Sequence, residues 1–405
     1  MERVVITGMG VFSGLGKNTH QFWSALCKEQ STIAPIHQVN TQHLRFKHGA
    51  EVNYFNSHCY FEAKQLDFLD RFSQFALLAA REAVIDSEIP PSSLQDQKTA
   101  VITGSAMGGK TTEDNAFYSL YRENKQRANP TTIPNIMANA GASHIAHAFG
   151  IIGPTYTLST ACASSTHAIG QAFWLIRHGL VTQAITGGSE APFALGQLKA
   201  WESMRIIAPD TCRPFSRGRG GMILGEGGAM LVLESYKTAL ARGAHIYAEI
   251  IGFGMSSDAK HITSPCSKGQ QRAIHAALND ANISHQAIQY INAHGTGTQL
   301  NDKIESETIQ AVFGSHTDNL AISSTKGAHG HLLGAAGAIE TVATALALHH
   351  QRIPPTLNFL GRDEQCNIPI CTKTTTLSFQ YALKNSFAFG GLNASLALKG
   401  YEPIL

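Results

Sequence analysis

Cys162 is the side chain best placed in this sequence to act as a nucleophile. It lies within residues 159–165, where its neighbours are small, between a strand expected at 156–158 and a buried helix expected at 168–176. This arrangement puts the sulfur at a helix N-terminus, where free backbone N–H groups and the helix dipole favour thiolate over thiol. The alternative interpretation is a buried structural cysteine.

Two downstream loops carry side chains that suit the same chemistry. His294 follows an expected strand in a run of small and hydroxyl-bearing residues, and Lys326 and His331 share a second loop of small residues. A cysteine thiolate can accept an acyl group while neutral imidazoles donate hydrogen bonds to a developing oxyanion. The pattern therefore indicates covalent acyl chemistry, although either histidine alone could be a loop residue with only local hydrogen bonds.

A glycine-rich segment supports a competing interpretation. Residues 104–111 fit the P-loop pattern G-x-x-x-x-G-K-[ST], with Lys110 placed for the outer phosphates and Thr111 for magnesium. The alternative is a glycine-rich strand-to-helix turn that precedes a lysine, and no downstream strand ends in a suitable aspartate. ATP binding that Lys110→Ala abolishes would support a nucleotide-dependent switch or ATPase.

Composition narrows the class of protein. The chain has 405 residues, 15% of them charged, and a formal net charge of +2, which argues against nucleic-acid binding. The seven scattered cysteines form no CxxC pair, so neither a disulfide framework nor a zinc site is expected. Without a signal-peptide pattern or a run of about 18 apolar residues, we expect a cytoplasmic protein that does not span a membrane.

Short β-branched runs alternate with helical patterns, which indicates α/β layers. Strands are expected at residues 3–7, 99–103, 183–186, 229–233 and 247–251, and helices at 72–83 and 269–281.

Parts of the chain also recur. Ser159-Thr160 returns 165 residues later as Ser324-Thr325, and residues 229–233 return at the same offset as 394–398. Residues 8–11 have a looser echo at 252–255. The recurrence predicts two related half-domains, an insertion in the first between about residues 20 and 150, and equivalent helices that begin near Cys162 and near Lys326.

The order of these motifs resembles the β-ketoacyl-acyl-carrier-protein synthases of the elongating type II kind, the KAS II group of the thiolase superfamily. The resemblance covers nearly the whole chain, through residues 4–10, 159–165, 213–215, 225–227, 292–298, 324–331 and 385–391. The family has a glycine-rich turn without a nucleotide role where the P-loop pattern lies. A degradative thiolase is disfavoured, because that relative has a second cysteine where this family has a histidine.

The resemblance implies a thiolase-like α/β fold of duplicated half-domains in a layered αβαβα arrangement. We expect an N-terminal half at residues 1–245, with the cysteine and a dimer-forming insertion, and a C-terminal half at 246–405 with both catalytic histidines. The implied reaction is a decarboxylative Claisen condensation of an acyl group on Cys162 with malonyl-acyl carrier protein (malonyl-ACP), in fatty acid chain elongation.

The resemblance also assigns roles to single residues. Cys162, His294, His331 and Lys326 are expected to be catalytic, with Lys326 orienting the histidines. The backbone N–H groups of Cys162 and Phe389 would form an oxyanion hole. Substrate contacts are implied for Thr296 and Thr298, which match the hydroxyls at the phosphopantetheine arm, and for Phe387 and Phe389, the latter as a gate. Asp302 and Glu305 are expected to be structural.

Three positions depart from the family pattern. Ala388 stands where glycine is usual, which would restrict the gate if this position needs a positive φ. Leu392 stands where threonine is usual. His329 replaces a threonine before Gly330-His331, and the Gly-His pair favours His331 as the catalytic histidine.

The resemblance implies acyl carrier protein as partner, with no metal and no cofactor beyond the carrier's phosphopantetheine. A homodimer is expected, or a heterodimer with a cysteine-less chain-length factor. Residues 198–212 resemble nodulation ketosynthases, so a polyketide, aryl polyene or unsaturated-acyl pathway is the alternative to fatty acid synthesis. Candidate basic residues for docking the acidic carrier are Lys64, Arg71, Lys199 and Arg205.

Overall fold

A ten-stranded sheet organises the computed structural model, which describes residues 1–402. The strands run in the order β10-β9-β13-β14-β8-β1-β7-β6-β4-β5. The first half of the chain supplies β1 (Val4–Ser13), β4 (Thr99–Gly104), β5 (Thr155–Leu158), β6 (Gln183–Glu190) and β7 (Gly227–Ser235). The second supplies β8 (Ala248–Ser257), β9 (Tyr290–Asn292), β10 (Ala321–Ser323), β13 (Tyr381–Ala388) and β14 (Leu392–Gly400).

The two sets of five strands have the same topology. In the first set β4 pairs in parallel with β5 and β6, then β6 and β7 pair antiparallel, as do β7 and β1. In the second set β9 pairs in parallel with β10 and β13, followed by antiparallel β13–β14 and β14–β8. The recurrences found in the sequence fall on equivalent strands or directly after them, so the predicted duplication is confirmed.

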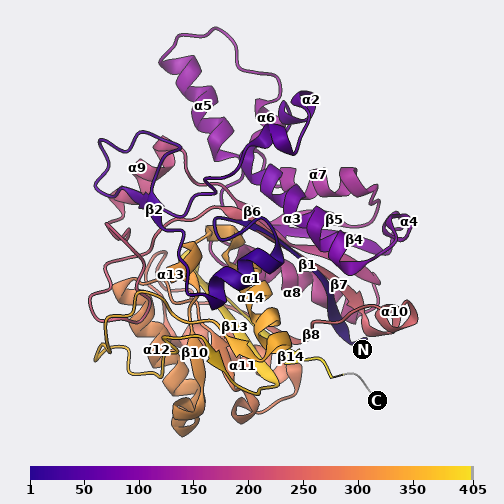
Figure 1. Ribbon diagram of the computed structural model, residues 1–405, viewed down its shortest axis with the longest axis vertical. Coiled ribbons are helices and arrows are strands. Elements are labelled where there is room, and N and C mark those ends of the chain that lie inside the picture. The colour runs from indigo at the N-terminus through magenta and orange to yellow at the C-terminus, as the bar shows by residue number, and fades with distance from the viewer. Residues whose placement is uncertain (403–405) are drawn as a thin grey trace.

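Helices form three layers around the sheet. One outer layer holds α3 (Arg71–Ser87) and α7 (Ala140–Phe149), and the other holds α11 (Ser267–Ala281) with α12 (Gln299–Phe313) beside it. Between the two sets of strands lie α8 (Ser164–Arg177) and α14 (Ala336–His350), near the centre of Figure 1. This is the layered αβαβα arrangement expected from the family resemblance.

Strand β1 runs beyond its predicted end, through Gly8 and Gly10, which lie against helix α3. A Cβ at Gly8 would lie 2.2 Å from the Ala83 carbonyl oxygen of α3, so the strand and the helix approach too closely for a larger residue. The second half repeats the device, since a Cβ at Gly252 would lie 2.3 Å from the Ala277 carbonyl oxygen of α11. These glycines therefore allow close packing of a strand against a helix in both halves.

The predicted start of the helix in the second half that corresponds to α8 is wrong. The counterpart of α8 is α14, which begins at Ala336 rather than near Lys326. Between them lie the single turn α13 (Lys326–His329) and the 3-10 turn η4 (Leu333–Ala335). The chain makes these turns after β10 because Gly330, with φ +70°, breaks the helix and lets His331 enter the site.

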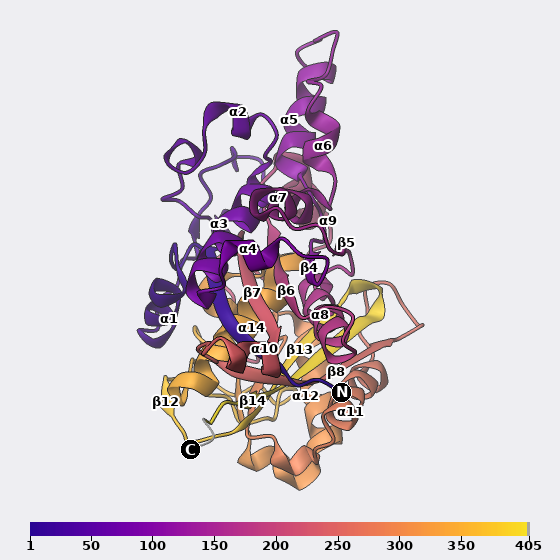
Figure 2. The same ribbon diagram turned by 90° about the vertical axis from the view of Figure 1, so that its right-hand side faces the viewer.

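Most of the additional elements lie in the first half of the chain. In Figures 1 and 2 the region of α5 projects from one end of the molecule. The additional helices are α1 (Thr19–Cys27), α2 (Ala63–Leu66), α4 (Pro91–Leu94), α5 (Lys110–Tyr121), α6 (Thr132–Ile136), α9 (Leu195–Ser203) and α10 (Tyr236–Ala241). Short strand pairs are β2 (Ala34–Pro35) with β3 (His48–Gly49), and β11 (Arg352–Ile353) with β12 (Thr375–Thr376).

Both halves share one large hydrophobic cluster, which extends from Val4 to Leu398. The division of the chain at 245/246 stays a prediction. The last three residues of the predicted C-terminal half lie outside the described part of the chain. Over residues 1–402, no helix combines the length and the apolar character that crossing a bilayer requires.

Candidate active site

Cys162 lies in a sharp turn between β5 and α8. Ala161 has a left-handed backbone with φ 49°, unusual for a residue with a Cβ. The Ser164 hydroxyl braces the turn, accepting from the Thr160 N–H at 2.9 Å and donating to the Ala161 carbonyl at 2.6 Å. The turn is held so that Cys162 lines a cavity of about 330 Å³.

The expectation that Cys162 is a thiolate is wrong for the protein without bound substrate. Burial raises the pKa of the Cys162 thiol to about 12; the Lys326 charge lowers it, while Glu190 and Glu340 raise it. The helix N-terminus was expected to favour thiolate, but removal of the sulfur from water outweighs that effect. Cys162 is therefore a neutral thiol at pH 7.

The same cavity brings together most of the residues identified in the sequence. Its lining includes Cys162, His294, His331, Thr296, Thr298, Phe387 and Phe389. The two imidazole rings lie 5.4 Å apart between centroids, at an interplanar angle of 82°. Lys326 is fully buried behind this surface and reaches His294 from the side opposite the cavity.

Hydrogen bonds set the tautomers of both imidazoles. Nδ1 of His331 accepts from the Leu333 N–H at 3.1 Å, and Nδ1 of His294 lies 3.5 Å from the Lys326 ammonium. A neutral ring whose Nδ1 accepts carries its proton on Nε2. Burial, followed by the Lys326 charge, holds the pKa of each ring well below its usual value, so both are neutral donors.

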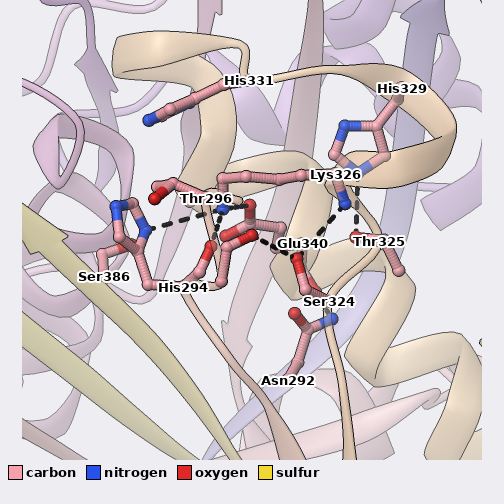
Figure 3. Close-up of polar contacts among 12 residues, drawn as sticks. Asn292, His294, Thr296, Ser324, Thr325, Lys326, His329, His331, Glu340 and Ser386 are labelled. Atoms are coloured by element: carbon pink, nitrogen blue, oxygen red, sulfur yellow. Dashed lines mark hydrogen bonds and ion pairs between the residues drawn. The ribbon is translucent and has the colours of Figure 1, made fainter. Parts of the chain in front are cut away.

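The His331 Nε2 atom is buried and has no hydrogen-bond partner within residues 1–402. A buried N–H donor without a protein acceptor that lines a cavity is available to an oxygen atom of a bound substrate. Figure 3 shows His294 and His331 on one side of the Lys326–Glu340 pair and His329 on the other. The geometry provides two neutral N–H donors near the sulfur, as stabilisation of an oxyanion requires.

Glu340 was not identified from the sequence. It is fully buried in α14 and forms an ion pair with the Lys326 ammonium, which also donates to the His294 carbonyl at 2.5 Å. Burial acts to raise the Glu340 pKa, but the charges of Lys326 and Lys384 lower it overall. The available signal was a single acidic residue in a helix whose other residues are apolar, apart from two threonines and two histidines at its end.

Asp302 and Glu305 hold the loop that carries His294. The Glu305 carboxylate accepts from the N–H groups of His294 and Gly295, each at 2.8 Å. Asp302 accepts from the Thr296 N–H at 3.0 Å. Both acids come from the first two turns of α12, so this helix fixes the loop conformation.

The two phenylalanines flank the cavity differently. Phe387 presents its ring to His294 at 6.2 Å, whereas Phe389 stacks on Trp201 of α9 at 6.3 Å. Ala388 between them has φ −111°, an extended conformation that any residue adopts, so the condition for a restricted gate is not met. The left-handed positions are Gly390 and Gly391, at φ 84° and 68°.

His329 lies outside the cavity lining. Its Nδ1 donates to the Gly330 carbonyl at 2.8 Å, and its Nε2 accepts from the Thr325 hydroxyl at 2.8 Å. Both ring nitrogens are therefore engaged within the core. Burial lowers the His329 pKa to about 4.

The glycine-rich loop 104–109 surrounds a carboxylate of the chain itself. Glu190 of β6 accepts from the N–H groups of Ala106 at 2.8 Å and Met107 at 3.2 Å, and from the Ser105 hydroxyl at 3.1 Å. A P-loop needs such N–H groups free for phosphate. Lys110 forms an ion pair with Glu113, so the nucleotide interpretation is not supported.

The candidate basic residues do not form one free patch. Arg71 forms an ion pair with buried Glu226 at 2.6 Å, and Lys199 forms one with Glu202 at 3.1 Å. Arg205 is exposed and lines the cavity, whereas Lys64 is exposed in α2. Of the four, Arg205 alone is placed by the structure at the mouth of this site.

Comparisons with known proteins agree over the whole chain. Residues 1–239 match the family model of the beta-ketoacyl synthase N-terminal domain, and residues 247–360 match that of the C-terminal domain. Nodulation protein E of Rhizobium sp. (strain N33) is 41% identical over 399 residues, which cover 98% of this chain and 99% of that protein. The 3-oxoacyl-[acyl-carrier-protein] synthase 2 of Staphylococcus aureus (strain COL) is 37% identical over 409 residues, 99% of each chain. The solved structure of the ishigamide ketosynthase/chain length factor superposes with a TM-score of 0.95 at 33% identity, covering 99% of this chain and 100% of that one.

Proposed function

The chain belongs to the β-ketoacyl synthase family, and from this premise we propose that it condenses an acyl group held on Cys162 with malonyl-ACP. It is an enzyme of the acyltransferase type. The observation that carries the proposal is the convergence of Cys162, His294 and His331 on one cavity from positions far apart in the chain.

In the first step the Cys162 sulfur attacks the thioester carbonyl of the acyl carrier. The N–H groups of Cys162 and Phe389 stabilise the oxyanion, the carbonyl carbon's bond to the carrier sulfur breaks, and the carrier leaves as a thiol with the proton lost by Cys162. The Lys326 charge, which lowers the pKa of the Cys162 thiol, favours this deprotonation.

In the second step the Nε2–H groups of His294 and His331 donate to the thioester carbonyl of the malonyl group. The bond to the malonyl carboxylate breaks, carbon dioxide leaves, and its electron pair forms an enolate stabilised by the two donors. The enolate carbon attacks the acyl-cysteine, and the sulfur leaves as thiolate and regains a proton. The sum is acyl-ACP, malonyl-ACP and one proton converted to β-ketoacyl-ACP, carbon dioxide and free carrier.

The remaining residues have supporting roles in this proposal. Thr296 and Thr298, whose hydroxyls lie 2.9 Å apart, contact the phosphopantetheine arm. Phe389 acts as a gate with Phe387 beside it. Acyl carrier protein is the partner, and its phosphopantetheine is the group the enzyme needs.

The decisive experiment uses Cys162→Gln with purified malonyl-ACP and acyl-ACP. We expect this variant to release carbon dioxide from malonyl-ACP while forming no β-ketoacyl product, because both histidine donors remain and the acyl acceptor is gone. His331→Ala is the matched variant, expected to lower the decarboxylation rate by about 100- to 1000-fold. Chain extension by Cys162→Gln would refute the mechanism.

A second candidate is a specialised polyketide, aryl polyene or unsaturated-acyl ketosynthase. It is favoured by the similarity to nodulation protein E and to the ishigamide ketosynthase/chain length factor. Because this chain has Cys162, it would be the catalytic subunit of such a pair. Purification from its own cells with mass spectrometry of the acyl-cysteine distinguishes the two: saturated chains on a homodimer support fatty acid elongation, and conjugated or polyketo chains with a copurified cysteine-less homologue support the second.

A dimer fits the edges of the sheet. The outer side of β10 is covered, because Ile322 bridges Ile370 and accepts from the Cys371 N–H at 2.8 Å. Strand β5 ends the other edge, with no further strand beside it within residues 1–402. An uncovered edge strand is a pairing surface, so we propose that a second subunit covers β5 and the projecting helix α5.

A further inference from the structure

Lys384 is a second fully buried lysine next to the catalytic histidines, and the proposed reaction makes no use of it. It lies in β13, in register with Asn292 of β9, two residues before His294. Its ammonium is 3.0 Å from Oε2 of Glu340, whose other oxygen pairs with Lys326. One buried carboxylate thus bridges two buried ammonium groups.

The hydrogen bonds of Lys384 go elsewhere. The ammonium donates to the Thr166 hydroxyl at 3.0 Å and to the Ser386 hydroxyl, and these two hydroxyls are 2.8 Å apart. Its contact with Glu340 is an ion pair outside the angular range of a hydrogen bond. Lys384 therefore joins the helix that follows Cys162, the strand that leads to Phe387, and the acid that holds Lys326.

Burial of a second ammonium group costs free energy, which points to a functional role for Lys384. Lys326 and Glu340 alone would form a neutral pair, so Lys384 adds a positive charge to a buried group. The other buried acid that acts on this charge is Glu305, which raises the pKa of Lys384. Lys384 is linked to Nδ1 of His294 through Glu340 and Lys326. Its positive charge therefore opposes protonation of the imidazoles. It also holds Oε2 of Glu340, so that Oε1 stays with Lys326 in the orientation that reaches His294.

Building on the proposed function, we propose that Lys384 is a positioning residue for decarboxylation: its ammonium fixes Glu340 and Lys326 and keeps His294 and His331 as neutral Nε2–H donors. The positive charge of Lys384 lowers the pKa of both histidines, after the larger effects of burial, of Lys326 and of a neighbouring histidine, which is His331 for His294 and His329 for His331. Burial lowers the pKa of Lys384 itself to about 8, so the group is charged at neutral pH.

The test is the pH profile of malonyl-ACP decarboxylation by Lys384→Met, which keeps the apolar stem and removes the charge. We expect kcat to fall by about 10- to 100-fold with little change in KM, as for a slightly misplaced catalytic group. The acid limb of the profile should move to higher pH, because the histidines protonate more easily without the neighbouring charge.

Two matched variants separate charge from packing. Lys384→Arg keeps the charge and should keep the acid limb of the wild type, as should Ser386→Ala, which removes a hydrogen bond but no charge. If Lys384→Met does not fold, Lys384→Gln retains hydrogen bonds to Thr166 and Ser386 and should show the same displaced limb.

An unmoved acid limb in a folded, uncharged variant overturns the inference, whatever its kcat. This outcome differs from failure of the proposed function, in which the wild-type protein itself would not decarboxylate malonyl-ACP.

Discussion

The thiol of Cys162 is surrounded by groups with opposing effects on its ionisation. Lys326 stabilises the thiolate, whereas Glu190 and Glu340 oppose it, and burial outweighs them all. A nucleophile that stays protonated until substrate arrives is protected from oxidants and alkylating agents, since the thiolate is the reactive form. In the proposed reaction, the cavity thus combines a protected thiol with donors that act once a thioester is bound.

This state of the sulfur predicts a particular pH dependence of alkylation. With the pKa of Cys162 at about 12, its thiolate fraction and its rate of reaction with iodoacetamide should rise about tenfold per pH unit between pH 7 and 9. Mass spectrometry of the peptide that contains Cys162 measures the rate at this site, with Cys162→Ser as control. A rate that levels off below pH 8 would show that the helix N-terminus prevails over burial.

At the scale of elements, the duplicated strand–helix units place the chemistry. Each half ends a parallel strand, β5 or β10, at a Ser-Thr pair that opens a turn toward the cavity. The units differ beyond this pair: the first turn leads into α8 and presents Cys162, whereas the second inserts α13 and η4 and presents His331. Divergence after a shared strand end gives one half the proposed nucleophile and the other a proposed oxyanion donor.

The glycine-rich loop before α5 offers a test at this scale. Glu190→Ala should lower the free energy of unfolding by about 3 kcal/mol, because it leaves buried N–H groups of the loop without an acceptor. Lys110→Ala removes only a partly exposed ion pair with Glu113 and should change the free energy of unfolding by less than about 1 kcal/mol. Urea unfolding measures both changes, and calorimetric titration should show no ATP binding. ATP binding that is lost in Lys110→Ala would restore the nucleotide interpretation.

At the scale of the whole molecule, buried and half-buried carboxylates tie segments that are distant in sequence. Glu82 of α3 accepts from the N–H groups of Val11 at 2.7 Å and Thr19 at 2.6 Å, and so joins α3 to β1 and to the start of α1. Glu190 and Glu305 act similarly at the site. Burial raises the pKa of each of these three groups to about 7.

These carboxylates predict that part of the stability is lost as the pH rises. The folded chain binds their protons more tightly than the unfolded chain, whose glutamates titrate near 4.5, so this contribution is full below pH 4.5 and declines through pH 7. Glu82→Gln removes one such group. Thermal unfolding midpoints from pH 5 to 8 should therefore shift in favour of the variant as the pH rises, whereas parallel curves would contradict the assignment.

The sequence by itself determined the α/β class, the duplication and the residues that meet in the cavity of the proposed active site. Cys162, His294 and His331 could be found because each lies in a short run of small residues whose order along the chain is specific to the family. The 165-residue recurrence could be found because equivalent strands retain similar apolar patterns. Such signals are local, so one chain suffices to detect them.

Only the tertiary structure decided the protonation and partners of those residues. The Lys326–Glu340–Lys384 group, the acceptor inside the loop at 104–109 and the neutral thiol of Cys162 all depend on contacts between distant segments and on exclusion of water. Desolvation depends on everything that surrounds a group in three dimensions, and no spacing of residues encodes it. The helix N-terminus at Cys162 was correctly placed, yet the burial that reverses its effect on the thiol became visible only in the fold.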